Sequence, residues 1–196
     1  MRITVFGASG TVGSDVVTEA RARGHHVTEV TRRIGDAANP DHVAEFALGR
    51  DVVIGATRPA HGHEPDLVKN TLGLLAGTAR AGVRLLLVGG AATLTVPGGG
   101  TMLDDPDFPA EFRAIATACA EQHAVCVADS AADWTYVSPP ALLEPGARTG
   151  RYRLGTDELL VDADGRSAIS TADFAVALLD EAERPAHRRT RFTVGY

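Results

Sequence analysis

The sequence predicts an α/β fold built on a doubly wound parallel sheet, in a single domain that spans residues 1–196. Three observations predict it. Short apolar runs alternate with longer amphipathic segments, which is the pattern of βαβ units. Glycines directly follow several of the apolar runs, where a chain leaving a buried strand must turn. The length of 196 residues allows one domain with a substantial core but no second large one.

The first half of the chain carries most of the alternating pattern. Short apolar runs predict buried strands, and apolar residues three or four positions apart predict helices. Asn39 is placed to cap one helix, and Gly24 and Gly82 are placed to end two others. The predicted strands cover residues 3–6, 27–30, 51–56 and 84–88, and the predicted helices cover residues 13–23, 40–48 and 66–81.

The second half of the chain is less regular. Glycine and proline are frequent from residue 94 to residue 109, which predicts a loop over the carboxyl edge of the sheet. Ser170 and Asp173 stand at capping-box spacing, so a helix is expected to begin near Thr171. We expect a helix over 108–126, a strand over 135–138 ended by Pro139-Pro140, a helix over 171–183 and a final strand over 191–194.

Composition and charge argue against two classes of protein. The 19 basic and 25 acidic side chains give a net charge of −6, whereas a nucleic-acid-binding protein normally carries a basic face. No apolar run approaches the length of a membrane span, and the N-terminal segment lacks the pattern of a signal peptide. We therefore expect a cytoplasmic protein without a nucleic-acid or membrane partner. These features do not indicate an oligomeric state.

The most informative motif is the glycine-rich segment Gly7–Gly13, GASGTVG, which lies between the first predicted strand and the first predicted helix. In a Rossmann-type fold the first glycine permits a sharp turn, the second lets the backbone approach a pyrophosphate, and the third allows close helix packing. A glycine turn without a ligand is the alternative, but the position inside a βαβ unit favours dinucleotide binding. The predicted cofactor contacts here are Gly7, Ser9, Gly10, Thr11, Val12 and Gly13.

The end of the second predicted strand indicates which dinucleotide is bound. An acidic residue there would bond the adenosine ribose and suit NAD, whereas this chain has Arg32 and Arg33. A guanidinium suits a 2′-phosphate through bidentate, charge-assisted hydrogen bonds, so NADPH is the favoured cofactor. NADH stays open because arginine can also stack on adenine. A solvated basic turn is the alternative without a ligand.

Two further turns follow strands at their carboxyl ends, where ligands bind in open α/β sheets. They contain Ala56-Thr57-Arg58 and Gly89-Gly90, and we expect both to flank the cofactor. Simple turns without a ligand would also explain them. The segment His61–Glu64 has too few ligands for a metal site, although His63 is a candidate for substrate contact. We predict no metal site, and we interpret Cys119 and Cys126 as reduced thiols.

The chain resembles the atypical short-chain dehydrogenases, specifically the small NAD(P)H-binding group related to NADH-flavin reductases. The resemblance covers essentially the full length. It rests on the segments Gly7–Gly13, Leu85–Leu94, Trp134–Tyr152 and the tail from Ile169 to Val194. It implies a small substrate-side region at about residues 142–169. It also implies that a nicotinamide lies near Thr57-Arg58, Gly89-Gly90 and Ser138-Pro139.

Two departures from this family's usual pattern matter. The dehydrogenase pair, a tyrosine followed four residues later by a lysine, is absent, because Lys69 is the only lysine and Pro65 stands four residues before it. No catalytic residue is therefore predicted. The stretch between Arg33 and Pro40 is also very short, so the usual third strand should be absent or vestigial. Asp36 in this stretch is expected to contact adenine, with a turn aspartate as the alternative.

These observations lead to a ranked set of functions. A carbonyl reductase needs a positioned acid to protonate the developing alkoxide, whereas flavin reduction needs mainly the stacking and orientation of two rings. We therefore expect an oxidoreductase that passes hydride from NADPH to a flavin or another planar small-molecule acceptor. A non-catalytic NADP(H) sensor and an epimerase- or dehydratase-like isomerase remain the alternatives.

Overall fold

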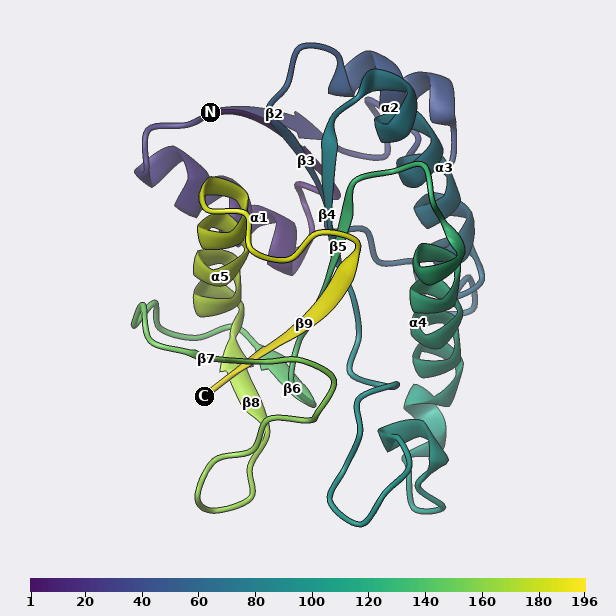
Figure 1. Ribbon diagram of the computed structural model, residues 1–196, viewed down its shortest axis with the longest axis vertical. Coiled ribbons are helices and arrows are strands. Elements are labelled where there is room, and N and C mark those ends of the chain that lie inside the picture. The colour runs from purple at the N-terminus through teal and green to yellow at the C-terminus, as the bar shows by residue number, and fades with distance from the viewer.

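A seven-stranded sheet with helices on both faces forms the centre of the computed structural model, which describes residues 1–196 (Figure 1). Six strands are parallel, and the edge strand β7 runs antiparallel to β9. The strand order is β2-β1-β3-β4-β5-β9-β7. The strands are β1 (Arg2–Phe6), β2 (His26–Val30), β3 (Val52–Gly55), β4 (Arg84–Val88), β5 (Trp134–Ser138), β7 (Arg153–Gly155) and β9 (Thr190–Gly195).

The helices cover the two faces of the sheet unequally (Figure 1). One face carries α1 (Thr11–Ala22) and α5 (Thr171–Glu183), which pack on each other. The other carries α2 (Pro40–Ala47), α3 (Asp66–Ala81) and α4 (Ala110–Ala128). None of these helices combines enough length and apolarity to cross a membrane. The arrangement confirms the doubly wound α/β fold that the sequence predicts.

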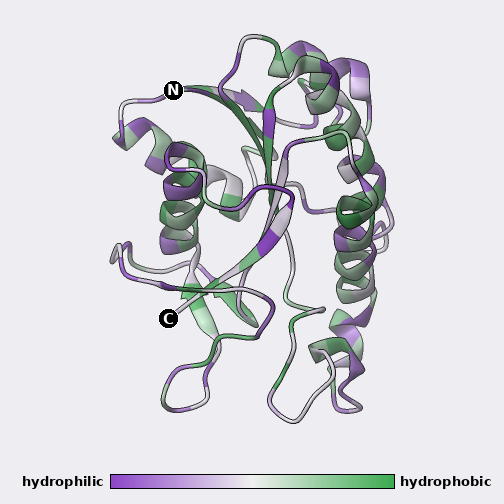
Figure 2. Ribbon diagram, viewed as in Figure 1, coloured by the Kyte–Doolittle hydropathy of each residue, from purple (hydrophilic) through white to green (hydrophobic).

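Alternating side chains of the strands build a separate core under each helical layer. Ile54 and Leu86 pack in the core beneath α1 and α5, whereas Val53, Leu85 and Leu87 pack in the core on the opposite face. Because successive strand residues point to opposite faces, a sheet covered on both sides needs continuous apolar runs. Figure 2 shows the central strands mostly in the hydrophobic colour, while the helices alternate between hydrophobic and hydrophilic segments.

The predicted elements are all present, with shifts of a few residues at their ends. Helix α1 begins at Thr11 rather than at the predicted Gly13, because the turn after Gly7 closes within three residues. The predicted loop over residues 94–109 also contains the short 3-10 helix η1 (Met102–Asp104). The sequence analysis missed three strands of three residues each, β6 (Leu142–Glu144), β7 and β8 (Ala168–Ser170). These strands are too short to show a hydrophobic period.

The predicted loss of the third strand is confirmed. No strand lies between β2 and α2, so β2 forms one edge of the sheet. The short connection instead lies directly on α3. Gly73 and Gly77 of α3 face Ala37, Ala38 and α2 so closely that a Cβ at either position would overlap neighbouring atoms. Glycine at these two helical positions therefore allows α2 and the turn before it to pack directly on the backbone of α3.

Replacing Gly73 tests this packing. A Cβ at residue 73 would overlap the carbonyl oxygen of Ala37, so Gly73→Ala should lower the free energy of unfolding by about 1–3 kcal/mol. Urea unfolding followed by circular dichroism measures the change. The control is Ala76→Ser on the exposed side of the same helix, which should stay within about 0.5 kcal/mol of the parent. Equal values for the two variants would contradict the packing argument.

Candidate functional site

The glycine-rich turn lies between β1 and α1 at the carboxyl edge of the sheet. Gly7 adopts a φ of +80°, which L side chains rarely adopt, and a Cβ on it would overlap the backbone of Ala56. A Cβ on Gly13 would overlap the carbonyl group of Gly7. Glycine at both positions therefore allows β1, α1 and the end of β3 to meet in close contact.

The N-terminus of α1 offers unpaired donors beside this turn. No side chain caps the helix, and its first turn carries no acidic residue. The backbone N–H groups of Thr11, Val12 and Gly13 have no acceptor within the protein. Ser9 and Gly10 next to them are exposed. Because a helix N-terminus carries partial positive charge, this arrangement fits the diphosphate of a dinucleotide.

A basic turn follows the edge strand β2. Arg32 and Arg33 are both exposed, and neither is paired with a carboxylate. Asp36 lies just beyond them, and one of its carboxylate oxygens accepts the N–H of Ala38 at 2.9 Å. That contact makes Asp36 a turn aspartate, with its second oxygen free of protein partners. The turn thus presents two exposed cations that are not paired with a carboxylate.

The ends of β3 and β4 form the next part of the same edge. Ala56 is buried against the glycine turn, Thr57 is half-buried and Arg58 is exposed. A Cβ on Gly89 would overlap the ring of Tyr136, and a Cβ on Gly90 would meet Cys119 at 2.7 Å. The glycine pair therefore lets the turn after β4 lie flat on β5 and α4.

Tyr136 of β5 binds the turn after β4 through a hydrogen bond. Its fully buried hydroxyl accepts the N–H of Gly90 at 3.1 Å and lies within hydrogen-bonding distance of Gln122 and of the carbonyl of Cys119. Burial raises the pKa of the Cys119 thiol to about 11, and the positive charge of Arg58 only partly opposes this effect. Cys119 is therefore a protonated thiol at neutral pH and not a nucleophile.

Ser138 and Pro139 end β5 and are both buried. The hydroxyl of Ser138 has no hydrogen-bond partner, and neither does the hydroxyl of Thr193, its neighbour on β9. Paired residues of parallel strands point to the same face, so the two buried hydroxyls lie on the same face of the sheet. Ser138 therefore lies behind the surface of the site.

The region at about residues 142–169, which the family resemblance implies to lie on the substrate side, contains the small parallel sheet of β6 and β8. A cavity of about 320 Å³ lies against it, with apolar surface from Pro145, Ile169 and Tyr196 and a cation from Arg166. The Gly7–Gly13 turn does not line this cavity. Leu143 of β6 nevertheless packs on the same apolar cluster as Val12 of α1. The region therefore adjoins the helix whose N-terminus offers the free donors.

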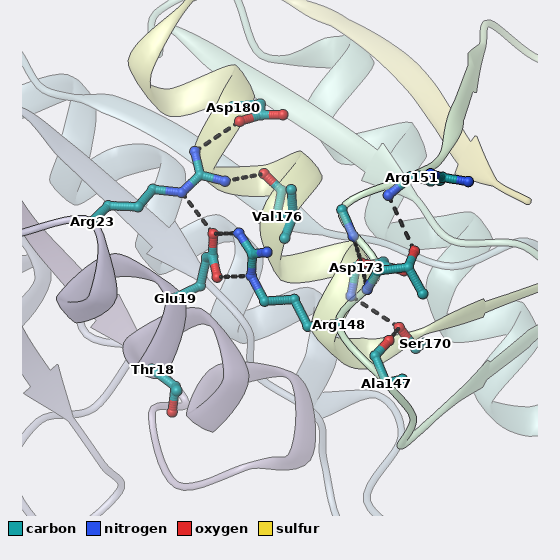
Figure 3. Close-up of polar contacts among 12 residues, drawn as sticks. Thr18, Glu19, Arg23, Ala147, Arg148, Arg151, Ser170, Asp173, Val176 and Asp180 are labelled. Carbon is teal, nitrogen blue, oxygen red and sulfur yellow. Dashed lines mark hydrogen bonds and ion pairs between the residues drawn. The ribbon is translucent and has the colours of Figure 1, made fainter.

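A buried carboxylate connects this region to α1 (Figure 3). Glu19 of α1 is almost fully buried and lies between Arg148 of the β6–β7 loop, at 2.6 Å, and Arg23, at 2.7 Å. Arg23 also reaches Asp180 of α5 at 2.7 Å. Hydrogen bonds from Arg148 and then Arg23 outweigh the effect of burial and lower the pKa of Glu19 to about 2.

A second carboxylate fastens the same loop to α5. Asp173 accepts hydrogen bonds from the backbone N–H groups of Thr149 and Gly150 and from the hydroxyls of Thr149 and Tyr196, at 2.6–2.8 Å. Its own N–H donates to Ser170, the N-cap predicted from the sequence. Burial alone would raise the pKa of Asp173, but these hydrogen bonds outweigh it and leave the pKa lowered.

The site lacks a side chain arranged as an acid for ketone reduction. The resemblance to short-chain dehydrogenases implies that their tyrosine and lysine would stand on α4 at Phe112 and Ala116, and neither of these side chains can donate a proton. His123 lies deeper on α4, and burial followed by the charge of Arg191 lowers its pKa. The imidazole is therefore neutral at pH 7, and its ring packs at 4.9 Å from the ring of Tyr136.

The His61–Glu64 segment forms no metal site, and Cys119 is the thiol that lies beside the candidate site, against Gly90. The His61–Glu64 segment is an exposed loop in which His61 pairs with Glu64 at 3.2 Å. The structure contains no group of three or more His, Cys, Asp or Glu residues placed to hold a metal ion. Cys119 and Cys126 are both free.

Sequence reasoning missed the residues that fix the substrate-side region. Glu19 carried a signal, because it stands on the buried side of the first helix three residues after Val16 and four before Arg23. A carboxylate at such a position requires a buried cation. Its second partner, Arg148, lies 129 residues away, and no spacing in the sequence connects the two. The contact between Gly90 and Tyr136 is equally distant in sequence, with a separation of 46 residues.

The parallel sheet, the glycine turn and the free donors of α1 define a Rossmann-type dinucleotide-binding domain. Residues 29–182 match the family described as NAD(P)H-binding, and the chain belongs to this oxidoreductase-like family, which takes a nicotinamide cofactor. The Bacillus subtilis protein YwnB is 37% identical over 208 aligned positions, which cover 99% of this chain and 98% of YwnB.

Two further relatives carry names that describe reductases. A solved structure from Streptococcus pneumoniae, provisionally named as an NADH-flavin reductase, is 30% identical with a TM-score of 0.91 over 100% of this chain and 99% of that one. A 3-diazoavenalumate denitrifying reductase from a Streptomyces species is 31% identical over 153 positions, which cover 59% of this chain and 49% of that reductase.

The Glu19 contacts make a prediction about acid stability. Because the pKa of Glu19 falls from 4.5 to about 2 on folding, its stabilisation is present above pH 4.5 and is lost as the pH falls toward 2. Glu19→Gln should therefore cost about 2–4 kcal/mol at pH 7 and much less near pH 2.5. Urea midpoints measured across this range test the trend.

A matched variant separates this effect from general acid denaturation. Glu144→Gln removes one partner of an exposed pair with Arg166, at 3.8 Å, and should change stability by less than about 1 kcal/mol at either pH. The Glu19 assignment is wrong if the penalty of Glu19→Gln stays constant between pH 7 and pH 2.5.

Proposed function

We propose that this protein is an oxidoreductase that transfers hydride from NADPH to a flavin or another planar small-molecule acceptor. The glycine turn carries the proposal, because it places three unpaired backbone donors of α1 beside an exposed, side-chain-free Gly10. The pair Arg32 and Arg33 supports NADPH over NADH, since both cations are free of carboxylate partners. The two free cysteines support a reducing compartment such as the cytoplasm.

The proposed cofactor contacts follow the carboxyl edge of the sheet. The diphosphate would lie at the Gly7–Gly13 turn, the 2′-phosphate at Arg32 and Arg33, and the adenine near Asp36. A bound nicotinamide supplies the hydride. The residues proposed to surround its ring are Ala56, Thr57, Arg58, Gly89, Gly90, Ser138 and Pro139, with Ser138 acting from behind the surface.

The proposed acceptor follows from the absence of a proton donor for ketone reduction in the site. Reduction of a ketone leaves an alkoxide that needs an acid. The family resemblance implies that the tyrosine and lysine that supply it in dehydrogenases would stand at Phe112 and Ala116 of α4. A flavin or a diazonium group accepts hydride at nitrogen and needs no protein acid at that atom. The names of the Streptococcus and Streptomyces relatives agree with acceptors of this kind. Positioning of the two reactants would then be the main contribution of the protein.

Two other functions fit the same geometry. A sensor would bind NADP(H) without turnover and pass its state to a partner. An epimerase- or dehydratase-like isomerase would regenerate its cofactor in each cycle. No residue of the site favours either of them over hydride transfer, and the acceptor panel below separates hydride transfer from the sensor.

Turnover with a panel of acceptors tests the proposed activity. NADPH oxidation followed at 340 nm should occur with FMN, FAD or a quinone, and Gly10→Trp should abolish it by filling the space beside the α1 donors. The control is Ala76→Ser, which lies on α3 away from the site and should keep full activity. Tight NADPH binding without turnover across the panel would favour the sensor.

Cofactor choice is tested at Arg32. Arg32→Glu should weaken NADPH binding by about 10- to 100-fold, the equivalent of about 1.5–3 kcal/mol for a charge-assisted contact, and should affect NADH far less. Calorimetric titration of both cofactors measures the difference. The control Arg80→Glu, on an exposed part of α3, should leave both affinities unchanged. An equal loss for the two cofactors would refute the assignment of the 2′-phosphate site.

A further inference from the structure

A short parallel contact joins two segments that are far apart in the sequence (Figure 1). Thr95 of the loop after β4 pairs with Glu158 of the segment after β7. The N–H of Thr95 donates to the carbonyl of Asp157 at 2.8 Å, and the N–H of Leu159 donates to the carbonyl of Thr95 at 2.9 Å. We call this contact the seam. It connects the turn after β4 to the proposed substrate-side region.

Arg191 of β9 binds both sides of the seam from inside the protein. Its side chain is only 7% exposed. One terminal nitrogen, Nη1, donates to the hydroxyl of Thr93 at 2.6 Å, whereas Nε and Nη2 donate to one carboxylate oxygen of Asp157 at 2.9 and 2.5 Å. The planar guanidinium presents these donors in a fixed geometry, so a single side chain sets how Thr93 and Asp157 lie relative to each other.

The exposed partner of Arg191 distinguishes it from the buried Arg84. Arg84 pairs with Glu181, whose side chain is 4% exposed, whereas the side chain of Asp157 is 67% exposed. Burying a charge is unfavourable, and an exposed carboxylate offsets little of this cost because water screens the attraction. Stability alone is therefore a weak reason for an arginine at residue 191. Its reach to two segments is a property that an apolar core residue would lack.

The two segments joined by the seam flank the carboxyl end of β5. On one side, a Cβ on Gly195 would lie 3.1 Å from Leu160 and 3.8 Å from Pro140, so the segment after β7 reaches the end of β5. On the other side, the loop that contains Thr93 continues directly from Gly90. The end of β5 and the turn after β4 are where the nicotinamide ring is proposed to lie. The seam is therefore placed to border an acceptor that stacks on this ring.

We propose that Arg191 is a positioning residue for the hydride acceptor, because it holds the loop of Thr93 and the segment of Asp157 at a fixed separation. This inference rests on the proposed function and adds the residue that sets the acceptor side of the site. Hydride transfer requires the two reacting atoms to lie close and aligned, so a small displacement of one wall lowers the rate. Arg191 acts through the two segments and makes no contact with the cofactor. Its loss should therefore affect the acceptor and not NADPH.

A matched pair of variants at Thr93 tests this role. Thr93→Val keeps the shape of the side chain but removes the hydroxyl that accepts from Arg191, whereas Thr93→Ser keeps the hydroxyl. With FMN, or with the acceptor of the panel that turns over fastest, Thr93→Val should lower kcat/KM for the acceptor by about tenfold. Thr93→Ser should recover most of this loss. Calorimetry should give the same Kd for NADPH, within about twofold, in both variants and the parent.

Variants of Arg191 itself provide a second test. Arg191→Lys keeps the positive charge but loses the planar fork that spans both segments, so it should match Thr93→Val. The double variant should be no worse than either single variant, because both changes break the same link. The control is Arg188→Lys, which alters an exposed pair with Asp133 just before β5, at the opposite end of the strand, and should keep the parent kinetics.

Hydrogen exchange tests the seam independently of turnover. In Arg191→Lys the amides of Thr95 and Leu159 should both exchange faster than in the parent, while the amides of β1 stay unchanged. Unchanged exchange at the seam, an equal loss of NADPH affinity, or a Thr93→Ser variant as slow as Thr93→Val overturns the inference. A parent without turnover on any acceptor overturns the proposed function and the acceptor role with it. The exchange rates then still decide whether Arg191 holds the two segments together.

Discussion

The contact between three backbone segments at the glycine turn is the constraint on which the rest of the site depends. Gly7 presses against Ala56 at the end of β3, and Gly13 presses against Gly7, with no room for a Cβ at either place. The contact brings the N-terminus of α1 down to the carboxyl edge of the sheet. Only from there can its free N–H groups meet a ligand that also reaches the ends of β3 and β4. The geometry of the turn is therefore set by backbone packing, before any ligand binds.

The same helix also fixes the substrate-side region. Two turns beyond its free N-terminus, α1 carries Glu19, which binds Arg148 of the β6–β7 loop and Arg23 (Figure 3). Asp173 at the start of α5 holds the adjacent residues Thr149 and Gly150. Both carboxylates are buried and several times hydrogen-bonded, so loss of Glu19 would take from Arg23 its buried partner, and loss of Asp173 would leave the N–H groups of Thr149 and Gly150 without an acceptor. The proposed cofactor site and the proposed substrate-side region thus contact the same pair of helices, α1 and α5.

The sequence predicts the long strands and helices well, but it predicts the short strands and the long-range contacts poorly. Continuous apolar runs such as that of β4 and the capping residue Ser170 are local signals, and the structure confirms the elements that they predict. The three-residue strands β6, β7 and β8 depend on distant pairing, and neither length nor period marks them. The short stretch between Arg33 and Pro40 did predict that the usual third strand is absent, because it has too few residues to form a strand and its connections. Gly73 and Gly77 of α3 allow this short connection to pack closely, but nothing in the sequence indicates that role before the packing is known.

Gly10 shows how structure separates two reasons for a glycine. Gly7, Gly13 and Gly89 are required by the protein itself, because a Cβ at each would overlap backbone or ring atoms. A Cβ at Gly10 would lie 3.3 Å from the carbonyl oxygen of Gly7 and 4.0 Å from that of Ala56, and its φ of −79° suits any residue. The backbone conformation therefore imposes nothing on residue 10, and packing imposes a tight contact rather than the overlaps found at Gly7 and Gly13. The remaining demand is the space in front of the α1 donors, and a closely approaching phosphate is the chemistry that needs that space.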